Sequence, residues 1–124
     1  MQKFILAITS IFFLYMAYTA FFKPQNIYRS LGIRNATNDL VNEIYGVYGG
    51  YGLITGLLLL YSLFDTTFAV YIQLIVGLSL NGMALGRIRG FAMAKNHSGK
   101  YPKIYFTVEL ILGTVSLLSW LYFN

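Results

Sequence analysis

The chain has 124 residues, of which 57% are hydrophobic, 18% are aromatic and only 10% are charged. Because average soluble domains carry about 25% charged residues, this composition excludes a disordered chain and argues against an ordinary soluble domain. The sequence contains no cysteine, which excludes a disulfide framework, a thiolate zinc site and a cysteine nucleophile. We expect lipid to be the solvent for most of this protein.

Apolar runs long enough to cross a bilayer dominate the chain, because about 20 helical residues span the hydrocarbon core. These runs cover residues 4–22, 42–64, 68–88 and 104–123. They are too long for the strands of an outer-membrane barrel. The sequence therefore predicts an all-α membrane protein, an antiparallel four-helix transmembrane bundle that forms one domain over residues 1–124.

The connections between these runs differ in length and composition. Residues 23–41 begin with Lys23-Pro24 and contain Thr37-Asn38-Asp39, which are residue types that favour a helix N-terminus. Residues 65–67 form a tight turn, so the second and third helices are expected to be antiparallel neighbours. Residues 89–103 are basic, and Pro102 is well placed near the start of the last helix.

Lysine and arginine are distributed unequally between the two membrane sides. The first and third connections and their flanks hold Lys23, Arg29, Arg34, Arg87, Arg89, Lys95, Lys100 and Lys103. The opposite side holds only Lys3. Since positive residues stay on the cytoplasmic side, both termini are predicted to face away from the cytoplasm.

The net charge of +5 also has to be explained. A nucleic acid partner would suit a basic chain, but topology and contacts with anionic lipid headgroups account better for these residues. No nucleic acid is therefore expected as a partner. The residues expected to contact anionic headgroups are Lys95, Lys100 and Lys103.

Glycine is concentrated in the second and third predicted helices. Membrane helices associate through close packing, which glycine permits, so we expect these two helices to approach each other closely. An interface of a homo-oligomer, or flexibility around a cavity, stays open as an alternative. The glycines assigned to helix packing are Gly46, Gly50, Gly52, Gly56, Gly82, Gly86 and Gly90.

Ionisable residues inside membrane spans are costly and are functional candidates by default. Here Glu43, Arg87 and Glu109 belong to the same membrane side and are expected to meet in one polar pocket that opens to the cytoplasm. They form either a structural ion-pair cluster or a site whose surplus carboxylate binds a cation, a proton or a ligand's ammonium group. The other residues predicted to line this pocket are Asn81, Tyr48 and Tyr105.

Enzymatic templates fit the sequence poorly. His97 is the only histidine and stands among turn residues, so we expect it to be solvated. There is no histidine cluster for haem or metal, no serine–histidine–aspartate set and no phosphate-binding glycine loop followed by lysine. The sequence therefore predicts no catalytic residue, no metal and no cofactor.

Three segments carry a family resemblance: residues 42–50 (NEIYGVYGG), 32–35 (GIRN) and 86–90 (GRIRG). Together they resemble a family of small bacterial inner-membrane proteins that is catalogued only as a domain of unknown function. The resemblance covers nearly the whole chain and implies a compact four-helix bundle in the bacterial cytoplasmic membrane. It marks Glu43, Gly49, Gly50 and Arg87 as positions of the family pattern, without assigning them roles.

Three functions are compatible with these features. The first is binding or transport of a lipid-like or cationic small molecule through the acid–arginine pocket. The second is a non-catalytic structural or accessory role in maintaining the envelope and its permeability barrier. The third is a lipid-modifying membrane enzyme that uses Glu43 or Glu109. Small multidrug transporter subunits have the same number of spans, but their key glutamate is in the first helix, whereas residues 4–22 here are uncharged.

Overall fold

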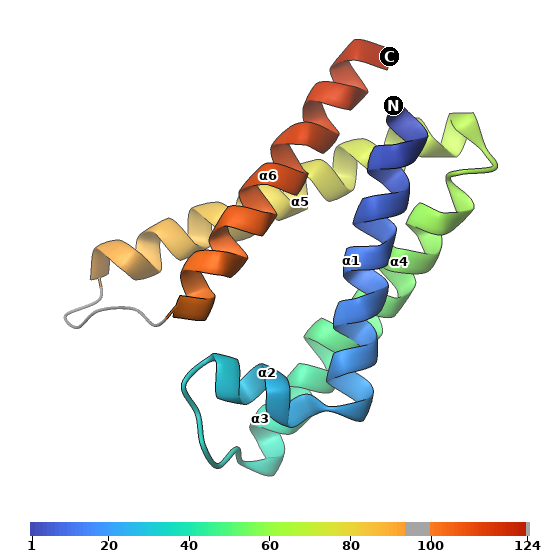
Figure 1. The fold of residues 1–124 in the computed structure, drawn as a ribbon. Coiled ribbons are helices and arrows are strands. Elements are labelled where there is room, and N and C mark those ends of the chain that lie inside the picture. Colours follow the sequence, from blue (N-terminus) through green and yellow to red (C-terminus); the bar gives the residue numbers. More distant parts are fainter. Residues whose placement is uncertain (94–99, 124) are drawn as a thin grey trace.

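The computed structural model describes residues 1–93 and 100–123, and side chains within these ranges except those of residues 100 and 101. Over these ranges the chain is helical, with no strand (Figure 1). The helices are α1 (Gln2–Phe22), α2 (Pro24–Ser30), α3 (Asn38–Glu43), the π-helix η1 (Ile44–Gly50), α4 (Tyr51–Tyr61), α5 (Thr66–Met93) and α6 (Lys100–Phe123).

Segments long and apolar enough to cross a membrane are Gln2–Phe22, Asn38–Tyr61, Thr66–Met93 and Pro102–Phe123. The prediction of an all-α protein with four membrane-crossing helices is therefore confirmed. Two of the helix starts have side-chain caps. The Thr37 hydroxyl accepts a hydrogen bond from the Leu40 amide at 3.2 Å, and the Asp65 carboxylate accepts one from the Phe68 amide at 3.0 Å.

The helices form two pairs, α1 with α4 and α5 with α6 (Figure 1). The pairs meet mainly through α1 and α6, and α1 is also tied to α5 by a 2.9 Å hydrogen bond from the Gln2 amide to the Gln73 side-chain oxygen. Helices α4 and α5 share the short turn but diverge from it (Figure 1). The expectation that they pack closely is wrong, because α4 packs mainly on α1 and α5 packs mainly on α6.

Glycine packing in the second span is directed at α1 rather than at α5. A Cβ atom at Gly52 would lie 3.2 Å from the Phe13 carbonyl oxygen, and one at Gly56 would lie 2.7 Å from Leu14. Helices α1 and α4 can approach this closely because these positions have no side chain. The Ser10 hydroxyl strengthens the contact by donating to the Gly56 carbonyl at 2.8 Å.

The other predicted packing glycines do not bring helices together within the chain. A Cβ atom would meet nothing within 4 Å at Gly46, Gly82, Gly86 or Gly90. At Gly50 it would meet only the carbonyl oxygen of Tyr45, at 3.8 Å. Whether these positions serve a homo-oligomer stays a prediction.

Close packing of α5 on α6 depends on two glycines outside that predicted set. A Cβ atom at Gly113 would lie 3.0 Å from the backbone nitrogen of Asn81, and one at Gly77 would lie 3.3 Å from the Gly113 carbonyl oxygen. Each lies on its helix where the partner backbone crosses. A glycine permits close packing only where the partner helix crosses it. The spacing of glycines along the sequence does not show where that crossing lies.

Two elements were not expected from the sequence. Helix α2 lies within the connection 23–41, begins at Pro24 and is followed by a turn in which Gly32 has a φ of 83°. The π-helix η1 interrupts the second span. π-Helical segments are rare in proteins, and those that occur are often found at functional sites.

Apolar side chains cover much of the outer surface. Phe4, Ile11, Tyr71, Leu85 and Leu118 are among the large side chains that are more than half exposed. A soluble monomer rarely exposes apolar surface on this scale. The surface therefore fits a multi-pass protein in lipid.

Candidate functional site

A bidentate ion pair joins α5 and α6 inside the helical region. Arg87 donates from Nε to Glu109 Oε2 at 2.7 Å and from Nη2 to Glu109 Oε1 at 2.8 Å. The Glu109 side chain is only 4% exposed, whereas that of Arg87 is 21% exposed. Two parallel charge-assisted hydrogen bonds fix both side chains. The structure thus brings together two of the three charges that the sequence placed in one pocket.

Glu43 does not join this pair. It is exposed at the end of α3, and no ion pair connects it to another residue in the described ranges. The expected three-charge pocket is therefore wrong, and so is its surplus carboxylate. A carboxylate without a cation beside it is costly to bury. Arg87 already donates to both carboxylate oxygens of Glu109, so Glu43 stays at the exposed end of α3.

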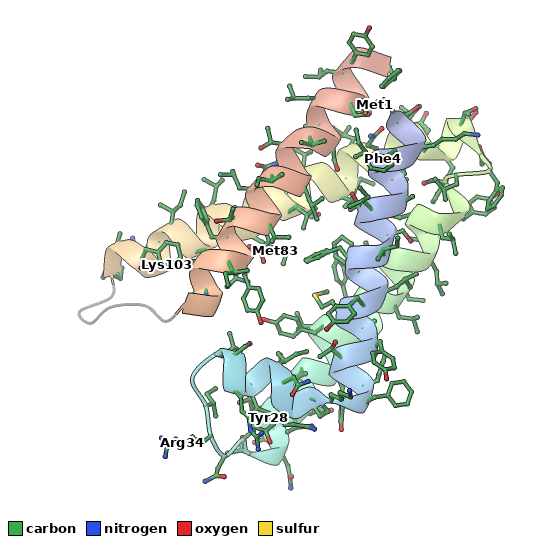
Figure 2. All side chains as sticks on the ribbon, in the orientation of Figure 1. Met1, Phe4, Tyr28, Arg34, Met83 and Lys103 are labelled. Carbon is green, nitrogen blue, oxygen red and sulfur yellow. The ribbon has the colours of Figure 1, made fainter. Side chains whose placement is uncertain are left out.

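A cavity of about 150 Å³ lies beside the ion pair, where α1, α2, η1, α5 and α6 converge. Most of its lining is apolar or aromatic, and Arg87 and Glu109 form a charged part of the wall. Met83 lies on α5 on the side toward α1 (Figure 2). The lining residues are Phe12, Tyr15, Met16, Thr19, Ile27, Tyr48, Met83, Arg87, Tyr105 and Glu109.

Tyr105 connects the ion pair to α2. Its ring centroid lies 5.2 Å from Arg87 Cζ, within the range of a cation–π interaction. Its hydroxyl oxygen is 2.6 Å from Ser30 Oγ, and Ser30 Oγ is also 2.6 Å from the Ile27 carbonyl oxygen. Since the serine proton is donated to that carbonyl, the Tyr105 hydroxyl donates to Ser30. This bond joins α6 to α2 at the edge of the cavity.

The other two predicted wall residues have different positions. Tyr48 lines the cavity from η1 and is half-buried. Asn81 is not among the lining residues; its amide donates to the Gly77 carbonyl at 2.9 Å and its oxygen accepts from the Thr114 hydroxyl at 3.3 Å. Asn81 therefore acts as a polar contact between α5 and α6.

Sequence reasoning missed the contribution of α1. Phe12, Tyr15, Met16 and Thr19 line the cavity from this helix, which carries no charge between Phe4 and Phe22. Their spacing of three, four and seven residues places them along one helical face. That periodicity was the available signal, but apolar residues on one face of a membrane helix usually face a neighbouring helix or lipid.

Some predicted contacts fall partly outside the described residues. Lys95, His97 and the side chain of Lys100 lie outside them, whereas Lys103 is exposed. Contact of these lysines with anionic headgroups stays a prediction. Within residues 1–93 and 102–123, no group of three or more histidine, aspartate or glutamate side chains could hold a metal ion.

Fold and site together define a class: a small all-α protein with four apolar helices, as in multi-pass membrane proteins, and a cavity beside an interhelical ion pair. The chain belongs to the family described as Domain of unknown function (DUF4345), whose profile matches residues 1–121. This match confirms the resemblance to an uncharacterised family. No curated protein and no solved structure matches the chain.

Proposed function

We propose that this protein binds a lipid-like small molecule in the cavity beside Arg87 and Glu109. The observation that carries the proposal is the lining itself, which is apolar and aromatic except for Thr19 and one bidentate ion pair. Small-molecule sites have this composition, with a few placed polar groups that orient the ligand. In the cell, the basic connections favour a cavity near the cytoplasmic face of the membrane.

The volume limits what the cavity can hold. An apolar protein cavity of about 150 Å³ accommodates a molecule the size of benzene, whereas sites for whole drug-sized ligands are about 300–1,000 Å³. The cavity here measures about 150 Å³. It would therefore hold one ring or a short length of hydrocarbon chain, and the rest of the ligand would extend out of it.

Electrostatics favour a lipid-like ligand over a cationic one. The pair of Arg87 and Glu109 carries no net charge, and both carboxylate oxygens already accept hydrogen bonds. The guanidinium has five N–H donors, of which Glu109 takes two. Since Arg87 lines the cavity wall with Glu109, an ammonium group in the cavity would face a guanidinium, whereas an uncharged hydrocarbon segment would meet no like charge.

Filling the cavity tests this proposal. The protein would be reconstituted in phosphatidylcholine nanodiscs with dodecanol, and bound dodecanol would be counted by native mass spectrometry after release from the disc. Met83→Trp places an indole at the cavity wall, and Met93→Trp is its matched control, because Met93 is 64% exposed on the same helix. We expect wild type and Met93→Trp to retain dodecanol and Met83→Trp to lose it. Absence of dodecanol from the wild type, or its retention by folded Met83→Trp, would contradict the proposal.

A structural role is the second candidate, and one observation favours it. The ion pair and the bond from Tyr105 to Ser30 together hold α5, α6 and α2 in place. A protein that only maintains the envelope needs such contacts but no ligand. If the cavity stays empty in the dodecanol experiment while the fold depends on Glu109, the structural role is the better account.

A further inference from the structure

We infer that the bound molecule is an amphiphile with an anionic headgroup, a phosphate or a carboxylate, which is held by Arg29 and Asn26 outside the inner cavity. This inference rests on the proposed function. It concerns the part of the ligand that the inner cavity is too small to contain. The inference is carried by a second, open cavity that adjoins the first and differs from it in charge.

The two cavities share part of their walls. Tyr15, Thr19, Ile27 and Tyr105 line both of them. The residues that only the outer cavity has are Asn26, Arg29 and Ser30, all on α2. A molecule that leaves the inner cavity past Tyr105 therefore passes directly beneath α2.

The charge of the lining changes along this path. The lining of the inner cavity includes one positive and one negative side chain, Arg87 and Glu109, whose charges cancel in their ion pair. The outer cavity contains Arg29 and no acidic residue. Arg29 is exposed and forms no ion pair with a residue in the described ranges. The outer cavity therefore has a net positive charge whose partner would come from outside the chain.

The chemistry of Arg29 and Asn26 fits an oxyanion. A guanidinium presents a planar set of donors that matches the oxygens of a carboxylate or phosphate. The Asn26 side chain adds two further N–H donors. Both side chains are exposed and line the outer cavity, so their donors are accessible from it. A cationic or zwitterionic headgroup would place its positive group against Arg29 and gain less.

The position of α2 agrees with a headgroup site. Helix α2 follows directly on the membrane-crossing helix α1, after Lys23 alone. It therefore lies where the hydrocarbon region gives way to the interface, the depth at which lipid headgroups are found. A hydrocarbon chain within the inner cavity and a headgroup at Arg29 would match the apolar-to-polar order of both the protein and the bilayer.

The test compares two probes that differ only in the headgroup. Dodecyl phosphate and dodecanol would be titrated into wild-type protein in phosphatidylcholine nanodiscs at neutral pH, with binding measured by native mass spectrometry. An exposed ion pair contributes up to about 1 kcal/mol, so we expect dodecyl phosphate to bind about fivefold more tightly than dodecanol. Arg29→Gln should remove this preference and leave dodecanol binding unchanged.

Arg34→Gln is the matched control, because Arg34 is an exposed arginine of the same connection that lines neither cavity. It should keep the preference. Inorganic phosphate alone should not displace dodecyl phosphate. If it does, the site binds free anions rather than amphiphiles, and the inference is overturned.

Two further outcomes separate this inference from the proposed function. If dodecanol binds in a Met83-dependent manner but the phosphate gives no preference, or a preference that survives Arg29→Gln, the inference is wrong and the proposed function stands. If neither probe binds, both are wrong.

Discussion

The α1–α4 pair and the α5–α6 pair are held together by different contacts. Between α1 and α4 the contact consists of apolar side chains against Gly52 and Gly56, with one hydrogen bond from Ser10. Between α5 and α6, glycines are supplemented by the bond between Thr114 and Asn81 and by the ion pair. Both pairs have close glycine contacts, so packing alone does not explain the added charges.

The paired charges that only the α5–α6 pair contains lie at the cavity between the two pairs. In lipid, small residues and van der Waals contact suffice to associate helices, and a charged pair within the span is expensive. The α1–α4 pair shows that this fold can join two long helices without any charge. The ion pair on the other side therefore fits a role at the cavity, whose wall it forms.

The largest expected effect breaks the α5–α6 pair. Glu109→Leu would leave Arg87 without its partner in a site where both Glu109 oxygens now accept its donors. Removing one partner of a buried pair typically costs about 3–5 kcal/mol. Because the Arg87 side chain is 21% exposed, we expect a cost at the lower end of this range, and thermal unfolding followed by circular dichroism should shift downward. The double variant Arg87→Met, Glu109→Leu should recover most of the stability, because no charge is then left unpaired. Equal stability of Glu109→Leu and wild type would show that the pair is not buried in this way.

A smaller effect is expected from overpacking the α1–α4 pair. Gly56→Val would place its Cβ 2.7 Å from Leu14, so the two helices would have to move apart. Overpacking of this kind costs about 1–3 kcal/mol, and the same unfolding measurement would detect it.

Gly86→Val is the matched control, because a Cβ atom there meets nothing within 4 Å and the position is exposed. It should unfold like the wild type. A large effect at Gly86 together with none at Gly56 would contradict the packing described for α1 and α4. A change in oligomer mass confined to Gly86→Val would instead favour an interface between copies.

The smallest effect concerns the link between the α5–α6 pair and α2. Tyr105→Phe removes the hydroxyl that donates to Ser30 and keeps the ring beside Arg87. A single hydrogen bond contributes about 1 kcal/mol, which should appear as a small decrease in unfolding temperature. Tyr122→Phe, at a side chain that is 83% exposed, should have no effect. If both variants behave alike, the bond to Ser30 does not contribute to holding α2.

The sequence predicted the features that depend on local composition. Apolar runs gave the four membrane-crossing helices, and Thr37 marked a helix start that it indeed caps. Arg87 and Glu109 could be expected to meet because two charges at the same depth of neighbouring spans gain from pairing.

Features that depend on the arrangement of whole helices could not be predicted in the same way. Gly82, Gly86 and Gly90 form a small-residue face as regular as that of Gly52 and Gly56, yet only the latter pair meets another helix. Glu43 ends α3 directly before the π-helix η1, so the spacing of a continuous α-helix does not place it relative to the cavity. The α1 face toward the cavity consists mainly of apolar side chains, and nothing in their chemistry separates a cavity wall from a lipid-facing surface.

Direct localisation of a bound chain tests the central claim, that the cavity beside the ion pair holds part of an amphiphile. Crystals of the protein grown from a lipid phase with 12-bromododecanol would show the bromine by anomalous scattering. The account predicts a bromine peak inside the cavity, among Phe12, Tyr48 and Met83. Bromine found only on the lipid-facing surface, with the cavity empty or closed, would contradict it.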